Sequence, residues 1–495
     1  MSRVKQVFEG VLPTTTNHEG YPAYIRPIKE QYLQALLTNT LGNTFYADRN
    51  VLLQEALDLH AEMMRTDPAY AARALVYARN EGLMRLQPIL GLVYLSQYDT
   101  ALFSRIFSQI IRIPPDLADF LTILSGLGRG QGGRAIKREV AGFLNGIDEY
   151  WALKYNGRGR GYNLGDAIAT AHPVPRDERQ NQLFRYLTGQ AAQLQELPQI
   201  AAFEALKRAD NDEQRIRHIN EGRLPHEVVT GTVQPTPAVW QAILHQLPLF
   251  ALLRNLNTLD RVGILDENRD YISRRLTDRE ALQKAKIMPF RFVNAFEQVH
   301  KAWMRDVLRQ AVEMCFANLP VLNGRSAIFL DISGSMSGEF IRIGSVFALA
   351  LFKLSGGQAI FWLFDTEVYD AQASLHDSIL SQAEKIKARG GTDTGAPLRA
   401  LRSSREKVDN IIMITDEQQN TGSPFYNELQ SYRRKYNPDT RAFIIDVAPY
   451  QGALVPPVDD LTHYIYGWAD TVVKYIVYSI DGYAGMAERV QAIEL

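Results

Sequence analysis

The chain has 495 residues, of which 46% are hydrophobic and 22% are charged. These values are those of an ordinary globular protein, and they exclude disordered, collagen-like and fibrous classes. At about 150 residues per domain, the length predicts two or three structural units instead of one core. Cys315 is the only cysteine, so no intramolecular disulfide can form, and we expect a reducing compartment, the cytoplasm.

Neither a membrane span nor a signal peptide is expected. No stretch approaches the roughly 18 uncharged apolar residues that a spanning helix needs. The first ten residues, MSRVKQVFEG, lack the apolar run of a signal peptide. We therefore expect no membrane partner.

The charge is uneven along the chain, although the formal net charge is only −1. Residues 1–330 contain 39 basic and 34 acidic residues, whereas residues 331–495 contain 15 and 21. Within the first part, residues 129–160 hold seven basic and three acidic residues. Such a cluster either attracts phosphate groups by counterion release or forms an ordinary solvated surface. Charge alone leaves both interpretations open.

The first part of the chain is predicted to be helical. From residue 31 to about residue 319, apolar residues recur at three- and four-residue spacing. Breakers divide this region into short helices, at Asp67-Pro68, Gln87-Pro88, Pro114-Pro115, His172-Pro173 and Pro235-Thr236-Pro237. No strict period and no TPR or ankyrin signature occurs, so we expect an irregular, HEAT-like array of helix pairs. Its last helix is predicted over 292–316.

A domain boundary is predicted between residues 322 and 323, because the pattern changes at Asn323-Gly324. Nearly continuous apolar runs follow, at residues 326–333, 359–365, 410–416 and 441–447, with a weaker run at 463–468. Runs of this kind alternating with helices predict a doubly wound α/β domain of buried parallel strands over residues 323–495. Ligands of such sheets bind outside the carboxyl ends of the strands.

Polar side chains gather where these strands end. The first strand runs directly into DISGS, which offers the Asp331 carboxylate and the hydroxyls of Ser333 and Ser335. The sequence Gly-Gly-Thr offers a third hydroxyl at Thr392, and Asp416 ends a further strand. Oxygen ligands suit a hard divalent cation, and Mg²⁺ keeps several waters. The sequence therefore predicts a Mg²⁺ site with a position left for an acidic group from a partner.

Two other interpretations of these residues remain. Ser333, Ser335 and Asp416 would cap helices if they served only local structure, because Ser and Asp favour N-cap positions. Asp331 and Asp416 would form the metal site of a hydrolase, yet neither motif contains a His or Lys for proton transfer. No Walker A loop, GxSxG elbow or HExxH helix occurs, and the Gly-rich residues 126–134 lack a Gly-Lys-Ser/Thr ending. We expect a binding protein without catalytic activity.

The motifs DISGS, GGT and ITD resemble, in order and spacing, the metal-ion-dependent adhesion site of von Willebrand factor A domains. The resemblance implies that Asp331, Ser333, Ser335, Thr392 and Asp416 form the metal shell, in part through water.

Four stretches extend the resemblance across the helical part: QYLQALLTNTLGNTFYADRN (31–50), GRAIKREVAGFLN (133–145), KYNGRGRGYNLGDAIATAH (154–172), and EGRLPHEVVT with VWQAILHQLPLFALLRNL (221–256). With the A domain, they resemble the Ro autoantigen family, whose TROVE module is a ring of helical repeats closed by a von Willebrand A domain. The resemblance implies a TROVE-like domain over residues 1–322 that binds small noncoding Y-type RNAs and single-stranded 3' ends of misfolded RNAs, in RNA quality control.

Single-stranded RNA is bound by basic side chains and by aromatic or His rings that stack on bases. Tyr155 and Tyr162 are candidates for stacking. The expected RNA-binding residues are Lys137, Arg138, Lys154, Arg158, Arg160 and His172. At Gly165 and Ala169 the chain departs from relatives that carry basic residues there.

A ribonuclease or another protein would bind through the A domain, and we expect a monomer. The rival hypothesis is a metal-dependent protein-interaction scaffold without an RNA role.

Overall fold

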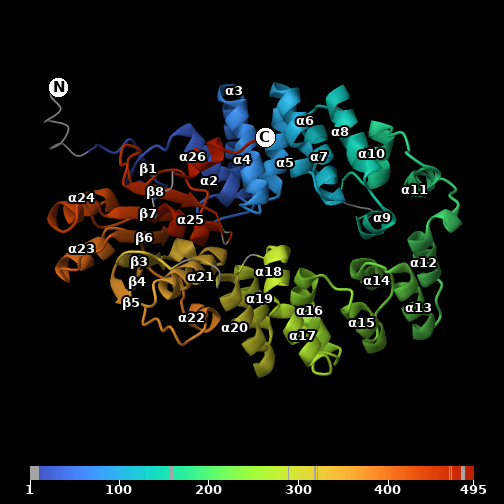
Figure 1. Ribbon diagram of the computed structural model, residues 1–495. Helices are drawn as coiled ribbons and strands as arrows, with labels where there is room; N and C mark the ends of the chain where they lie inside the picture. The colour runs from blue at the N-terminus through green and yellow to red at the C-terminus, as the bar shows by residue number, and fades with distance from the viewer. Residues whose placement is uncertain are drawn as a thin grey trace. The chain divides into compact units, whose positions relative to one another are not determined.

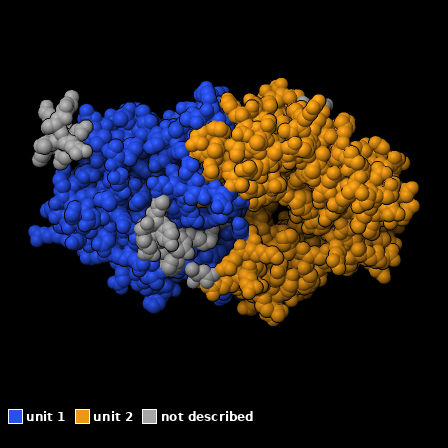
Figure 2. Space-filling view, turned by 45° about the horizontal axis from the view of Figure 1, so that its top comes forward, with its two compact units in different colours: residues 1–66, 80–87, 286–494 blue, residues 67–79, 88–285, 495 orange. Residues whose placement is uncertain are grey.

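The computed structural model describes residues 11–130, 132–155, 161–287, 289–316, 319, 321–467, 469, 471–480 and 485–495. The chain divides into two compact units, coloured in Figure 2. Unit 1 contains residues 1–66, 80–87 and 286–494, and unit 2 contains residues 67–79 and 88–285, with residue 495. None of the described helices is long and apolar enough to cross a membrane.

Unit 2 is built from helices, as the spacing of apolar residues predicts (Figure 1). Pro68, Pro114 and Pro237 each begin a helix, where the missing N–H of proline costs nothing. The helices are α4 (Pro68–Asn80), α5 (Leu86–Tyr98), α6 (Thr100–Ile110), α7 (Pro114–Gly126), α8 (Arg134–Asn145), α9 (Glu149–Tyr155), α10 (Leu164–Ala171), α11 (Glu178–Leu187), α12 (Pro198–Leu206), α13 (Asp212–Gly222), α14 (His226–Thr232), α15 (Pro237–Leu244), α16 (Leu249–Arg261), α17 (Arg269–Leu276) and α18 (Arg279–Ala285). The short 3₁₀ helix η1 (Leu194–Glu196) precedes α12.

Neighbouring helices of unit 2 pack through apolar and charged contacts. The rings of Phe103 and Phe107 on α6 lie 6.0 and 5.7 Å from the ring of Phe120 on α7. Arg79 on α4 forms a 2.7 Å ion pair with the fully buried Asp116 at the start of α7. Helix α8 packs against both α6 and α10. The predicted array of short packed helices is confirmed for the described residues.

Unit 1 contains a six-stranded sheet in the order β5-β4-β3-β6-β7-β8. The strands are β3 (Ser326–Asp331), β4 (Ile360–Phe364), β5 (Val368–Asp370), β6 (Asn410–Thr415), β7 (Arg441–Asp446) and β8 (Thr462–Tyr466). All neighbours pair in parallel except β4 and β5. The five predicted strands are confirmed, whereas β5 lies outside the predicted runs.

Helices cover both faces of the sheet. On one face, Phe329 and Met413 share a core with Leu398 of α23 (Ala396–Ser403) and Leu429 of α24 (Phe425–Lys435). On the other face, α21 (Glu339–Leu354) packs closely against the sheet. A Cβ added to its Gly344 would lie only 2.8 Å from the side chain of Leu330 on β3. The sheet unit is therefore doubly wound, as predicted. Unit 1 also contains η2 (Gly334–Met336), α22 (Ile379–Ala383), α25 (Thr471–Ile480) and α26 (Met486–Gln491).

The N-terminal part of the chain belongs to the sheet unit. It forms the hairpin β1 (Thr15–Thr16) and β2 (Pro22–Ala23), followed by α2 (Ile28–Thr38) and α3 (Arg49–Thr66). Gln34 on α2 donates a 2.6 Å hydrogen bond to Asp446 at the end of β7. Tyr24 and Ala453 exchange backbone hydrogen bonds across an antiparallel bridge.

The predicted boundary at residues 322 and 323 does not coincide with the division into compact units. Helices α19 (Phe290–Gln298) and α20 (Ala302–Phe316) precede β3 but lie in unit 1. Ion pairs tie them to the α/β part, Arg342 with Glu297 at 2.9 Å and Lys353 with Glu313 at 3.1 Å. A change of pattern in the sequence marks where strands begin, not which helices pack on them.

The prediction of a single helix over 292–316 is wrong, because the helix is interrupted between α19 and α20. Val299 is extended at the C-cap of α19. The Arg305 guanidinium lies 3.7 Å from the centre of the Phe296 ring and donates a 3.0 Å hydrogen bond to the Phe296 carbonyl. This contact satisfies a carbonyl at the end of α19 and stabilises the break.

Acidification is expected to weaken unit 1 through His60, a fully buried side chain. His60 Nδ1 lies 3.0 Å from the Tyr32 hydroxyl, and Nε2 lies 3.0 Å from the Gln87 side-chain oxygen. Burial lowers the pKa of His60 from 6.5 to about 4. Between these values the unfolded chain binds more protons, so the stability from neutral His60 is present above pH 6.5 and is lost towards pH 4. The full loss is about 3 kcal/mol.

The measurement is the urea midpoint at pH 7, 5.5 and 4.5 for wild type and His60→Gln, since other groups titrate in the same window. We expect the difference in urea midpoint between wild type and His60→Gln to become smaller as the pH is lowered. If the urea midpoints of the two proteins fell in parallel with pH, His60 would not be the group responsible for the loss of stability.

Candidate functional site

The five predicted metal ligands lie at the carboxyl edge of the sheet and are all buried. Asp331 ends β3, Ser333 and Ser335 follow it, Thr392 lies in the loop before α23, and Asp416 follows β6. Their exposed fractions are 0 to 4%. The end of β3 borders β4 on one side and β6 on the other, so the loops after these strands converge here.

Hydrogen bonds hold the DISGS turn in place. Asp331 Oδ1 accepts a 2.8 Å bond from the Ser333 N–H, and Asp331 Oδ2 accepts a 2.6 Å bond from the Thr415 hydroxyl. The hydroxyl oxygens of Ser333 and Ser335 lie 3.2 Å apart. One carboxylate and two hydroxyls are therefore fixed as a group.

The Gly390-Gly391-Thr392 loop is locked onto the same turn. Gly334 N–H donates a 3.0 Å bond to the Gly390 carbonyl. Gly390 has a φ of +74°, a conformation that favours glycine. Thr392 N–H donates a 3.0 Å bond to the side-chain oxygen of Asn420, in the loop after Asp416. These bonds bring Thr392 and the loop of Asp416 to the DISGS turn.

Two buried carboxylates share this edge, and each is harder to ionise than a carboxyl group in water. Burial raises the pKa of Asp331 to about 6, with a further contribution from the charge of Asp365. Burial and the charge of Asp331 raise the pKa of Asp416 to about 7, while the Ser335 hydroxyl lowers it in part. The edge is therefore short of positive charge when both groups are ionised.

Helix capping does not explain these residues. Ser333 is the N-cap of η2, but its side chain makes no capping hydrogen bond. The N-cap of α21 is Gly338 and that of α24 is Pro424, so neither Ser335 nor Asp416 occupies those positions.

A divalent cation fits this set of residues. Asp416 Oδ2 is buried and has no hydrogen-bond partner among the residues that the structure describes. A buried polar atom without a partner is costly, and a cation would satisfy it. Two carboxylates and three hydroxyls are hard oxygen donors of the kind that Mg²⁺ prefers.

The sequence interpretation missed several neighbours of this edge. Thr415 holds Asp331, and Asp365 at the end of β4 forms a 3.3 Å ion pair with Arg389. Burial raises the pKa of Tyr46, and the charge of Asp416 contributes to the rise. Thr415 and Asp365 could have been recognised because each lies at the end of a predicted strand, whereas no local pattern marks Tyr46.

The predicted RNA-binding residues lie on unit 2. Lys137 and Arg138 belong to α8, which presents Ile136, Val140 and Leu144 to the core. The Arg138 side chain is 68% exposed and contacts Glu139 at 2.9 Å and the Ser104 hydroxyl at 2.8 Å. Arg138 is therefore accessible to a phosphate, although Glu139 offsets part of its charge.

Lys154 is less accessible. Its side chain is 15% exposed, and its Nζ lies 3.2 Å from Glu227 Oε1. The rings of Tyr150 and Tyr155 lie 5.7 and 5.5 Å from the same Nζ. Although burial acts in the opposite direction, hydrogen bonding from His226 and the charge of Lys154 lower the pKa of Glu227 to about 2. The charge of Lys154 is thus compensated by a carboxylate of α14.

His172 is exposed and forms the left-handed C-cap of α10, with a φ of +48°. Its N–H donates a 2.9 Å bond to the Ile168 carbonyl. The capping role and an accessible ring coexist at this residue. Arg158 and Arg160 lie outside the described residues.

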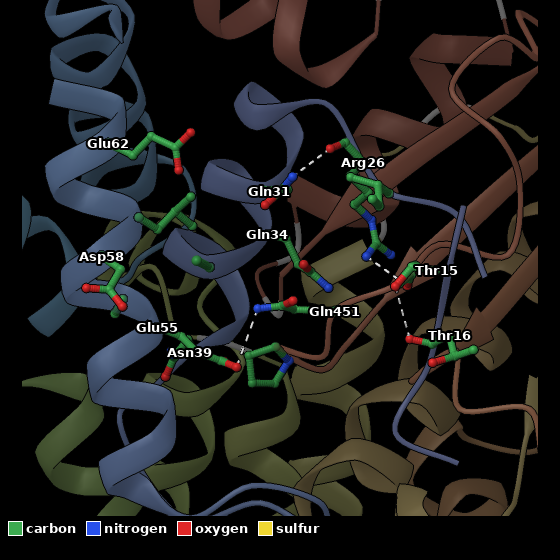
Figure 3. A pocket seen from close by; sticks show the side chains of 16 residues that line it. Thr15, Thr16, Arg26, Gln31, Gln34, Asn39, Glu55, Asp58, Glu62 and Gln451 are labelled. Atoms are coloured by element: carbon green, nitrogen blue, oxygen red, sulfur yellow. Dashed lines mark hydrogen bonds between the residues drawn. The ribbon is translucent and has the colours of Figure 1, made fainter. Parts of the chain in front are cut away.

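A separate cavity of about 370 Å³ lies within unit 1 (Figure 3). Glu55, Asp58 and Glu62 of α3 form one wall, and Arg26 and Gln34 lie across from them. Gln34 is engaged with Asp446 and with the Tyr450 carbonyl, both at 2.6 Å. This cavity is a consequence of how the N-terminal segment packs, and we assign no ligand to it.

Comparison with known proteins gives a consistent picture. The TROVE domain family matches residues 227–337. "RNA-binding protein RO60" of Deinococcus radiodurans is 26% identical over 483 residues, covering 89% of this chain and 90% of that protein. "RNA-binding protein RO60" of Caenorhabditis elegans is 25% identical over 308 residues, covering 56% of this chain and 47% of that protein. The crystal structure of the Deinococcus radiodurans RO (RSR) protein matches with a TM-score of 0.68 at 22% identity, covering 92% of this chain and 99% of that one.

Proposed function

Because the chain belongs to the Ro family, we propose that it is an RNA-binding protein whose helical unit 2 receives the RNA. The observation that carries the proposal is the similarity to "RNA-binding protein RO60" of Deinococcus radiodurans, which extends over nearly all of both chains. The exposed guanidinium of Arg138 on α8 supplies a phosphate contact of the kind this function needs.

The RNA class of this proposal is small noncoding RNA of the Y type and the single-stranded ends of misfolded RNAs, in RNA quality control. Basic and aromatic side chains support it, since Tyr150 and Tyr155 flank Lys154 within one cluster. Single strands are held by such pairs without strict sequence readout.

The sheet unit is proposed to be a von Willebrand A-type domain that holds Mg²⁺ through Asp331, Ser333, Ser335, Thr392 and Asp416. Asp416 Oδ2, which has no hydrogen-bond partner in the described part of the chain, supports a cation at this edge. The site is proposed to bind without catalysing a reaction, because its polar groups are carboxylates and hydroxyls that suit a metal shell.

The RNA proposal is tested by the salt dependence of binding to a 5'-labelled single-stranded RNA with a free 3' end. Lys137→Ala with Arg138→Ala is expected to weaken binding and to reduce the slope of log affinity against log salt by about 1.4, if each residue neutralises one phosphate. The matched control is Arg434→Ala with Lys435→Ala, which removes two exposed positive charges from α24 of unit 1. We expect the control to keep the wild-type slope.

Equal salt-dependence slopes for the two double variants would show that α8 does not contact the RNA. Absence of RNA binding by the wild-type protein would instead favour the rival function, a metal-dependent scaffold for an acidic protein partner.

A further inference from the structure

Asp416 lies in a turn that occupies only one of its two carboxylate oxygens. The Gln418 N–H donates a 3.2 Å hydrogen bond to Asp416 Oδ1. Asp416 Oδ2 is buried and has no hydrogen-bond partner among the residues that the structure describes. The backbone of Gln418 therefore orients the carboxylate and leaves Oδ2 for the proposed cation.

The side chain of Gln418 ties this turn to the N-terminal hairpin of β1 and β2. Gln418 is fully buried. Its Nε2 donates a 3.2 Å bond to the Asp416 carbonyl, and its Oε1 accepts a 3.0 Å bond from the His18 N–H. An N–H needs an acceptor and a carbonyl needs a donor, so these two partners set the orientation of the amide. Gln418 thus links a backbone N–H of the hairpin to the candidate metal ligand.

The backbone between Asp416 and Gln418 has an unusual conformation that the N-terminal segment helps to hold. Glu417 has a φ of +61°, which is uncommon for a residue other than glycine. Its carboxylate pairs with the buried Arg26 and accepts a 2.9 Å bond from the Leu454 N–H. Such a conformation persists where the surrounding contacts hold it. The N-terminal segment therefore contacts both residues that follow Asp416.

The turn of the hairpin directs the His18 N–H at Gln418. The Gly20 N–H donates a 3.0 Å bond to the Asn17 carbonyl, so His18 is the second residue of a β-turn. The side chain of Asn17 fastens this turn to the loop, because its Nδ2 donates a 2.8 Å bond to the Gln419 carbonyl. The hairpin is thus anchored on both sides of the contact between His18 and Gln418.

We propose that Gln418 is a positioning residue of the metal site, and that the hairpin acts through it to set the affinity for a divalent cation. The inference rests on the metal site proposed above. The hairpin holds Gln418, and Gln418 holds Asp416 with Oδ2 unoccupied. By linkage, a bound cation stabilises the contact of Gln418 with the hairpin to the same degree. A partner that displaced the hairpin would therefore also weaken the binding of the metal.

The first test is a calorimetric titration of the full-length protein with Mg²⁺. Gln418→Met keeps the length of the side chain but loses both of its hydrogen bonds. Loss of an outer-shell group costs about 10- to 100-fold in metal affinity, so we expect Gln418→Met to bind Mg²⁺ at least about 10-fold more weakly. The matched control is Gln358→Met, at an exposed glutamine just before the amino end of β4, which should bind as wild type does.

A second pair of variants isolates the His18 N–H. His18→Pro and His18→Ala both lose the imidazole ring, but only His18→Pro loses the N–H. Proline suits the second position of this turn, because neither His18 nor Glu19 has a positive φ. We expect His18→Pro to bind Mg²⁺ at least about 10-fold more weakly than His18→Ala. Equal affinities of these two variants would show that the His18 N–H does not act on the metal site.

Hydrogen exchange of the His18 N–H separates positioning from a general loss of stability. Saturating Mg²⁺ should slow this exchange in wild type and in Gln358→Met, and should leave it unchanged in Gln418→Met. Wild-type Mg²⁺ affinity in Gln418→Met would overturn the role of Gln418 and leave the metal site standing. No Mg²⁺ binding by the wild-type protein would overturn both the metal site and this inference.

Discussion

Replacing Arg26 with alanine is expected to lower the free energy of unfolding of unit 1 by about 3–5 kcal/mol, because it leaves two buried carboxylates without a counter-charge. The Arg26 side chain is 2% exposed and forms ion pairs with Glu417 and Asp446, the latter at 3.1 Å. It also donates a 2.9 Å bond to the Gly452 carbonyl, and its guanidinium lies 5.0 Å from the centre of the Tyr464 ring. Although burial acts against it, the charge of Glu417 raises the pKa of Arg26.

The measurement is the thermal midpoint, with two comparison variants. Arg434→Ala removes an exposed arginine of the same unit and should change stability by less than about 0.5 kcal/mol. Arg26→Lys keeps the charge but loses the two-armed guanidinium, whose Nη2 contacts both carboxylates while Nη1 binds the Gly452 carbonyl, so its thermal midpoint should fall between those of wild type and Arg26→Ala. Equal midpoints for Arg26→Ala and Arg434→Ala would show that the N-terminal segment is not anchored by this ion pair.

The local pattern of the sequence predicts most elements of the fold. Strands β3, β4, β6, β7 and β8 coincide with apolar runs. The runs are clearest for β3 and β6, which are buried along their whole length, and weakest for the edge strand β8, which is only partly buried. The three-residue strand β5 and the two-residue strands of the β1–β2 hairpin are too short to show a period. The break between α19 and α20 depends on the contact of Arg305 with Phe296, which periodicity does not reveal.

Long-range packing is where prediction from the sequence fails. Arg26 and Asp446 are 420 residues apart and form one buried ion pair. Glu417, its other partner, directly follows a predicted metal ligand and does not stand out from it in the sequence. The membership of the N-terminal segment in the sheet unit is therefore visible only in three dimensions.

The candidate metal site was predictable because its ligands lie at strand ends, and parallel strands end at one edge. The contact of the N-terminal hairpin with the loop after Asp416 was not, since Asn17 and His18 belong to no motif and reach that loop only through the fold. On unit 2, the sequence shows that Lys154 is basic, but only the structure shows that Glu227 neutralises it at 3.2 Å. Arg138, with its exposed side chain, is the stronger candidate for a phosphate contact.

Asp416→Asn is expected to change stability in opposite directions with and without metal. Without metal, the substitution removes one of two buried carboxylates whose negative charges repel each other. The thermal midpoint should therefore rise, by an amount equivalent to about 1–3 kcal/mol. With Mg²⁺ at 1,000 times its dissociation constant, wild type should gain about 4.1 kcal/mol, and the variant should gain nothing at the same concentration. The two midpoints would therefore cross as Mg²⁺ is added.

The matched control for this experiment is Asp439→Asn, which removes the same charge from an exposed position before the amino end of β7, at the opposite edge of the sheet. It should keep the wild-type response to Mg²⁺. RNA affinity should be the same in wild type and Asp416→Asn, because Arg138 and Lys154 belong to unit 2 and Asp416 to unit 1. An equal gain from Mg²⁺ in wild type and Asp416→Asn would place the cation elsewhere, and a loss of RNA affinity in a folded variant would show that the metal site and the RNA interface are coupled.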